Sequence, residues 1–242
     1  MNREYHRWHS PNLNRQMELL VFGHAGAKVI VFPTRDGRFW EYESIRLVES
    51  IAPKLNAGLL QLFCVDSVDH ESFYCFWSRP EGRIQRHMQF ERYVLEEVLP
   101  FVQKTNAHPK TIAHGCSLGA FHAVTIALRH PHLFQKICAF SGRYDLTLSV
   151  EHFRNLFDGY YDEQIYFHTP THFLGQLNCE TRLAQMRGMD IVLTIGAEDP
   201  FLENNRHLSR LLSAKNIRHE LHVWDGRAHA GGAWRRMAPL YL

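Results

Sequence analysis

Short apolar runs alternate with segments of helical periodicity along most of this 242-residue chain. Such alternation implies an α/β fold with a mostly parallel central sheet and helices on both faces, because parallel neighbours need a crossover connection. The apolar runs predict strands at 16–23, 28–32, 59–65, 111–114, 137–140, 190–195 and 220–224. The periodic segments predict helices at 40–52, 90–105 (kinked or interrupted at Pro100), 120–129, 202–215 and 233–242.

One segment, 147–187, breaks this alternation and is rich in aromatic residues. A loop-rich insertion of this length in a compact domain is usually functional, so we interpret it as a cap-like insertion over a site. The alternative is a peripheral helical excursion that packs on the sheet edge. No linker, repeat or low-complexity tract occurs, and we expect a single domain over 1–242.

Composition excludes several functional classes. A formal net charge of +2 is too small to argue for nucleic acid as a partner. The five cysteines form no C-x-x-C pair, which argues against a disulfide framework or a zinc knuckle. No secretory h-region and no membrane-length apolar run are present, so we expect a cytoplasmic protein without a membrane partner. Phosphate-binding glycine motifs are also missing, and no cofactor is expected.

The turn Gly115-Cys116-Ser117-Leu118-Gly119 lies between a predicted strand and a predicted helix. A G-x-S-x-G turn in this setting projects the serine hydroxyl clear of the backbone and directs a helix N-terminus at the reacting carbonyl. Ser117 is therefore the candidate nucleophile. The alternative is that Ser117 merely caps the helix.

A serine nucleophile needs a base, and the base needs an orienting carboxylate. Asp199 follows the predicted strand 190–195 and is the candidate acid, with Glu198 as the runner-up and helix capping as its alternative role. His229 follows the strand 220–224 in a loop of small residues and is the candidate base. The other candidates for the base, His219, His222 and the buried strand residue His114, are less favourably placed. A solvent-exposed loop histidine is the alternative for His229.

These motifs resemble the esterase D and enterochelin-esterase branch of the α/β-hydrolases, known as the putative esterase family. The likeness lies in the glycine turn around Ser117, in Gly196–Asp199, in Trp234 five residues after His229, and in the helix-like run Leu95–Pro100. The resemblance implies an α/β-hydrolase fold and a serine esterase.

Two parts of the chain depart from the family pattern. After the strand that ends at Phe32, the usual glycine turn is replaced by Pro33-Thr34-Arg35-Asp36-Gly37-Arg38. After His229, the acidic and aromatic residues common in the family are replaced by Ala230-Gly231-Gly232. The resemblance implies an oxyanion hole built from two backbone N–H groups. We expect these to come from Leu118 and Arg35, with Asp36 as the next choice.

Other candidate sites are weaker. His168 and His172 lack a third ligand and flank Pro170, so no metal site is predicted. His6 and His9 are expected to be strand or terminal residues. The charged side chains of Arg35, Asp36 and Arg38 either orient substrate or form a solvated loop.

We therefore predict a carboxylic ester hydrolase that forms an acyl-enzyme on Ser117, with His229 as base and Asp199 as the acid of the triad. The aromatic segment suggests a small or medium apolar acyl group on a small-molecule ester. An acyltransferase with the same triad, or a non-catalytic binding protein on the hydrolase fold, is the alternative. A homodimer is compatible with such a chain.

Overall fold

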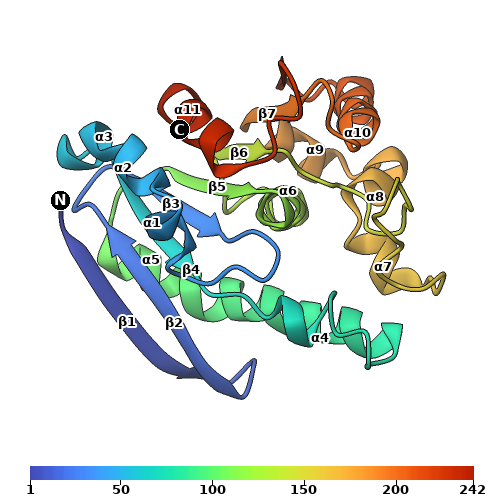
Figure 1. Ribbon diagram of the computed structural model, residues 1–242, viewed down its shortest axis with the longest axis horizontal. Coiled ribbons are helices and arrows are strands. Elements are labelled where there is room, and N and C mark those ends of the chain that lie inside the picture. The colour runs from blue at the N-terminus through green and yellow to red at the C-terminus, as the bar shows by residue number, and fades with distance from the viewer.

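A single eight-stranded sheet forms the centre of the computed structural model, which describes residues 1–242 (Figure 1). The strand order across the sheet is β1-β2-β4-β3-β5-β6-β7-β8. The strands are β1 Arg3–Ser10, β2 Arg15–Phe22, β3 Ala27–Phe32, β4 Leu60–Val65, β5 Thr111–Cys116, β6 Lys136–Phe140, β7 Asp190–Gly196 and β8 Glu220–Trp224. All seven predicted strands are present to within two residues.

The six strands from β4 to β8 across the sheet are parallel, and β2 is antiparallel to both of its neighbours. The edge strand β1 has no counterpart among the predicted strands, although His6 and His9 were expected to be strand or terminal residues, and both lie in it. Its side chains are mostly polar and exposed, which is how an edge strand avoids pairing with other chains. The mostly parallel α/β sheet is therefore confirmed.

The helices follow the predicted positions except in two places. The helix predicted at 40–52 is divided into short helices, first by the left-handed conformation of Arg46 and again at Ile51, and the last of them continues to residue 56. The helix predicted at 90–105 begins ten residues earlier and passes through Pro100 after a π-helical turn. The helices are α1 Glu41–Ser44, α2 Leu47–Ser50, α3 Ala52–Asn56, η1 Asp69–Glu71, α4 Pro80–Tyr93, η2 Val94–Val98, α5 Leu99–Thr105, α6 Leu118–Arg129, α7 Glu163–Phe167, α8 Pro170–Gln176, α9 Glu180–Arg187, α10 Leu202–Ala214 and α11 Gly231–Tyr241.

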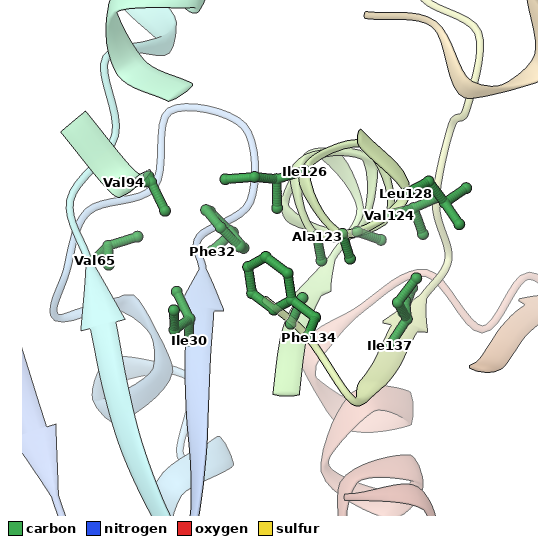
Figure 2. Close-up of a cluster of buried hydrophobic side chains, with 14 of the residues drawn as sticks. Ile30, Phe32, Val65, Val94, Ala123, Val124, Ile126, Leu128, Phe134 and Ile137 are labelled. Carbon is green, nitrogen blue, oxygen red and sulfur yellow. The ribbon is translucent and has the colours of Figure 1, made fainter. Parts of the chain in front are cut away.

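The two faces of the sheet are covered by different helices. Along β3, Val29 and Val31 point to the core shared with α1–α3 and α11, whereas Ile30 and Phe32 point to the core shared with α4–α6 and α8–α10. This alternation follows the two-residue period of a strand. Figure 2 shows the second core, with Ile30 and Phe32 facing side chains of α6 around Phe134. No helix is both long and apolar enough to cross a membrane.

Segment 147–187 divides into two parts. Its helices α8 and α9 contribute Phe173, Leu174, Leu183 and Met186 to the core beside α6 and α10. Its first residues, around 152–156, instead line a cavity. Segment 147–187 therefore packs on the core through its helices and forms part of a cavity wall through its first residues.

The order of the strands determines where a ligand can bind. From β3 the chain moves to β4 on one side and then returns to β5 on the other. At such a switch point the loops after the two strands separate, and open α/β sheets bind ligands there. Ser117 follows β5, and the loop containing Thr34 and Arg35 follows β3.

Candidate active site

Ser117 occupies a strained turn between β5 and α6. Its backbone has φ 55° and ψ −119°, a region that non-glycine residues adopt only when their surroundings require it. Although Ser117 stands at the N-cap position, its hydroxyl makes no capping hydrogen bond to α6. The side chain is therefore available for another partner.

The glycines beside Ser117 are required by close backbone packing. A Cβ at Gly119 would lie 2.2 Å from the carbonyl oxygen of Phe32, and one at Gly115 would lie 2.2 Å from the carbonyl carbon of Gly119. Neither glycine has a positive φ, so space rather than conformational freedom selects them. The start of α6 consequently packs directly against the end of β3.

A chain of hydrogen bonds joins the three predicted residues. The Oγ of Ser117 lies 2.9 Å from Nε2 of His229, and Nδ1 of His229 lies 2.6 Å from Oδ2 of Asp199. The Asp199 side chain is fully buried, whereas the His229 side chain is 18% exposed. The other oxygen of Asp199 accepts the N–H of Phe201 at 2.9 Å, which fixes the carboxylate at the start of α10.

The alternative residues lie elsewhere. Glu198 is exposed and makes no side-chain hydrogen bond. His219 bonds to Ser209, and His222 pairs with Glu220. His114 is buried between Tyr42 and the carbonyl of Cys138, and burial lowers its pKa to about 4. None of these three histidines contacts Ser117.

The loop that carries His229 is held by Ser141, a residue that the sequence analysis did not identify. Ser141 follows β6 with a φ of 54°, and its hydroxyl donates to the carbonyl of Ala228 at 2.9 Å. The same hydroxyl accepts the indole N–H of Trp234 at 3.0 Å. In the sequence, only the five-residue spacing between His229 and Trp234 pointed to this arrangement. Ser141 explains the spacing, because its hydroxyl bonds to the residue before His229 and to the Trp234 indole.

The loop after β3 and the first residue of α6 carry the backbone N–H groups expected to form the oxyanion hole. The N–H of Thr34 donates to Glu41 at 2.7 Å and is therefore occupied. The N–H groups of Arg35 and Leu118 donate to no protein acceptor. Leu118 begins α6, where the helix dipole favours negative charge. The N–H of Asp36, the next choice for the oxyanion hole, also donates to no protein acceptor, but of Arg35 and Asp36 only Arg35 lines the cavity beside Ser117.

A cavity of about 540 Å³ opens above Ser117 and His229. Tyr74, Phe76, Phe153 and Trp234 form its aromatic surface. Of the charged loop, Arg35 lines the cavity, whereas Arg38 pairs with Asp66 and Glu18 away from it. Only one of the two loop arginines can therefore meet a ligand at Ser117.

The two histidines considered as metal ligands have different neighbours. His172 makes hydrogen bonds with Asp145 and Tyr161. His168 lies near His87 and Glu91, and each of these three residues has a nitrogen or carboxylate oxygen within 4.8 Å of those of the other two.

Burial opposes the charge of Glu91, but the hydrogen bond from His130 and the cation of Arg129 lower its pKa to about 2. The Arg129 guanidinium already occupies both oxygens of this carboxylate, which disfavours a divalent ion there.

Comparison with known proteins agrees with this geometry. A family model described as Putative esterase matches residues 10–237. A search of curated proteins finds no match. A ferulic acid esterase structure is similar, with a TM-score of 0.76 and 14% identity over 99% of this chain and 95% of the other.

S-formylglutathione hydrolases are also similar. The one from Agrobacterium tumefaciens has a TM-score of 0.74 and 15% identity over 98% of this chain and 91% of the other. The one from Staphylococcus aureus has a TM-score of 0.71 and 16% identity over 97% and 94%. These likenesses establish the α/β-hydrolase fold. Because the family model covers nearly the whole chain, the protein belongs to this esterase family of the α/β-hydrolases and is a carboxylic ester hydrolase.

Proposed function

We propose that the protein hydrolyses small-molecule carboxylic esters through an acyl-enzyme on Ser117. The observation that carries this proposal is the unbroken hydrogen-bond chain from Ser117 through His229 to the buried Asp199 at the base of the cavity. A hydroxyl, an imidazole and a carboxylate in this order form the catalytic unit of serine hydrolases on several unrelated folds.

In the first half-reaction, Nε2 of His229 removes the proton from Ser117 as Oγ attacks the ester carbonyl. Asp199 holds the imidazole in the required tautomer and stabilises the imidazolium that forms. The N–H groups of Leu118 and Arg35 stabilise the oxyanion, because neither is committed to a protein acceptor. The tetrahedral intermediate then releases the alcohol, which takes its proton from His229.

In the second half-reaction, His229 removes a proton from water, and the resulting hydroxide attacks the acyl-enzyme. Collapse of this intermediate releases the carboxylic acid and returns the proton to Ser117. An alcohol in place of this water would give acyl transfer with the same three residues. Product analysis with added alcohols distinguishes the two outcomes, and we expect the free acid to predominate.

The replacement Ser117→Ala tests the nucleophile. We expect it to lower kcat for p-nitrophenyl acetate by at least about 10³-fold and to abolish labelling by a fluorophosphonate probe. The matched control is Ser213→Ala, which removes an exposed hydroxyl at the end of α10. Full activity or full labelling of the Ser117→Ala protein would contradict the proposal, and an unlabelled, inactive wild type would favour a non-catalytic binding protein.

A further inference from the structure

The cavity at Ser117 carries an excess of positive charge. Three of its lining side chains are the guanidinium groups of Arg35, Arg143 and Arg154, and no aspartate or glutamate is among the residues that line it. Hydrolysis of a neutral ester needs the hydroxyl, the imidazole and the backbone donors, but no cation beside them. The arginines therefore call for a separate explanation.

Arg143 is the most informative of the three because it is only 7% exposed. Its Nε and Nη2 atoms donate to the backbone carbonyls of Asp145, Leu146, Leu148 and Arg154. It forms no ion pair, and its Nη1 donates to no protein acceptor. A buried charge without a carboxylate partner is costly to maintain, and a guanidinium with a free N–H edge is suited to binding an oxyanion.

The other two arginines are more exposed, and like Arg143, whose Cζ lies 5.3 Å from the centroid of the Phe201 ring, they stand on aromatic rings. Arg154 lies over Phe76, with its Cζ 3.5 Å from the ring centroid, and it forms no ion pair. Arg35 lies over Tyr74 at 5.3 Å and is only 3.6 Å from Asp36, so its charge is partly compensated. Stacking on an aromatic face holds a guanidinium in place without neutralising it.

We propose that the natural substrate is an ester bearing a carboxylate or similar anionic group, which Arg143 and Arg154 bind while Ser117 attacks the ester carbonyl. This inference rests on the proposed hydrolysis at Ser117. The aromatic residues of the cavity then contact the apolar part of the same molecule. The expectation of an apolar acyl group thus becomes one of an apolar body that ends in an anion.

Matched substrate pairs test this assignment. On the acyl side, p-nitrophenyl hydrogen adipate is compared with p-nitrophenyl hexanoate; on the alcohol side, 4-acetoxybenzoate is compared with 4-methylphenyl acetate. Each kcat/KM is divided by the rate without enzyme at the same pH. We expect the anionic member of at least one pair to be preferred about tenfold or more, and added salt to reduce the preference. Equal or slower turnover of both anionic esters would overturn the inference and leave hydrolysis at Ser117 intact.

Charge-removing variants assign the preference to residues. We expect Arg154→Gln, alone or combined with Arg35→Gln, to reduce the ratio of anionic to neutral kcat/KM about tenfold. Arg154 is exposed, so its replacement is compatible with folding. The control is Arg92→Gln, which removes the same charge from an exposed position on α4 outside the cavity and should leave the ratio unchanged. A preference that survives in the double variant would contradict the role assigned to Arg154 and leave Arg143 alone as the anion-binding group.

A binding measurement keeps the inference testable independently of catalysis. Isothermal titration of the Ser117→Ala protein compares benzoate with its neutral analogue benzamide. We expect tighter binding of benzoate and loss of this difference when Arg154→Gln is added. If neither neutral nor anionic esters are cleaved but benzoate binds selectively, the hydrolytic proposal fails and the anion site remains. If benzoate and benzamide bind equally, the anion site fails.

Discussion

At the scale of single residues, Asp199 performs two tasks with its two oxygens. One contacts the His229 imidazole and the other accepts the N–H of Phe201. The sequence alone presented these as alternatives, a triad acid or a helix cap, because both roles place an aspartate directly after a strand. In the structure Phe201, not Asp199, is the N-cap residue of α10, and the Asp199 carboxylate accepts the N–H of Phe201 in the turn just before the helix while its other oxygen contacts His229.

The replacement Asp199→Asn separates the two tasks. An amide can still accept the Phe201 N–H, so we expect the melting temperature to change little. It can no longer stabilise the imidazolium, and we expect kcat for p-nitrophenyl acetate to fall about 10³–10⁴-fold. The neighbouring change Glu198→Gln removes an exposed carboxylate and serves as the control. Equal and small effects of the two changes would refute the orienting role of Asp199.

The sequence predicted the residues of this site unequally, for a physical reason. Ser117, Asp199 and His229 each follow a strand of recognisable pattern, so their meeting at one sheet edge follows from parallel topology. Arg143 and Arg154 lie in irregular loops whose conformation depends on distant contacts. Neither local periodicity nor spacing indicated that they would share a cavity with Ser117.

At the scale of elements, Arg83 of α4 connects three segments of the chain. Its side chain is only 2% exposed and donates to the carbonyls of Cys75, Ser78 and Leu156 and to the carboxylate of Asp158. Because Leu156 lines the cavity, this one residue ties the cavity wall to a helix. Arg83 lies in the first turn of α4, where no helix was predicted from the sequence.

The replacement Arg83→Met therefore affects more than local packing. It leaves buried carbonyls without donors, and we expect the free energy of unfolding to fall by about 3 kcal/mol or more. We also expect KM for ester substrates to rise as the wall around Leu156 loosens. Urea unfolding and steady-state kinetics measure the two effects.

The control for Arg83 lies one turn further along the same helix. Arg86 pairs with Glu71 in a more exposed position, and Arg86→Met should cost about 1 kcal/mol or less. If the two replacements destabilise the protein equally, Arg83 does not have the connecting role inferred from its hydrogen bonds.

The predicted elements differ from the observed ones where local conformation competes with pattern. The apolar spacing of 40–52 suits a helix, yet Arg46 adopts a left-handed conformation that divides it. Strand β1 was not predicted because its sequence is mostly polar and lacks the apolar run that identified the other strands. The buried parallel strands, by contrast, were all predictable because burial on both faces makes them apolar throughout.

At the scale of the whole molecule, buried histidines link stability to pH. Burial lowers the pKa of His114 to about 4 and also lowers the pKa of His87 and His168, from an ordinary value of 6.5. Below pH 6.5 the unfolded chain therefore binds protons that the folded protein excludes. Stability is fully present above about pH 6.5 and declines as pH falls towards 4.

His114 is expected to lower the free energy of unfolding by about 1 kcal/mol between pH 7 and pH 5.5, and His87 and His168 act in the same direction. Urea unfolding at these two pH values measures the change. Burial raises the pKa of Glu41 and of Asp66, so their protonation at lower pH increases the free energy of unfolding, opposite to the effect of the histidines. The comparison is therefore kept at pH 5.5 and above. The variant His114→Asn should have a shallower pH dependence, whereas exposed His70→Asn should match the wild type. An unchanged slope in His114→Asn would show that His114 does not contribute.

The separation of the catalytic candidates along the chain has a kinetic consequence. Ser117 and His229 are 112 residues apart, and they meet only when the strands between them have taken their places in the sheet. A collapsed folding intermediate with native helices but an incomplete sheet would not place the Ser117 hydroxyl next to the His229 imidazole. Contacts of such long range form late and slowly during folding. The rate at which esterase activity returns after dilution from urea therefore reports the last step of folding. We expect this rate to be slower than the rate at which the helical circular dichroism signal returns.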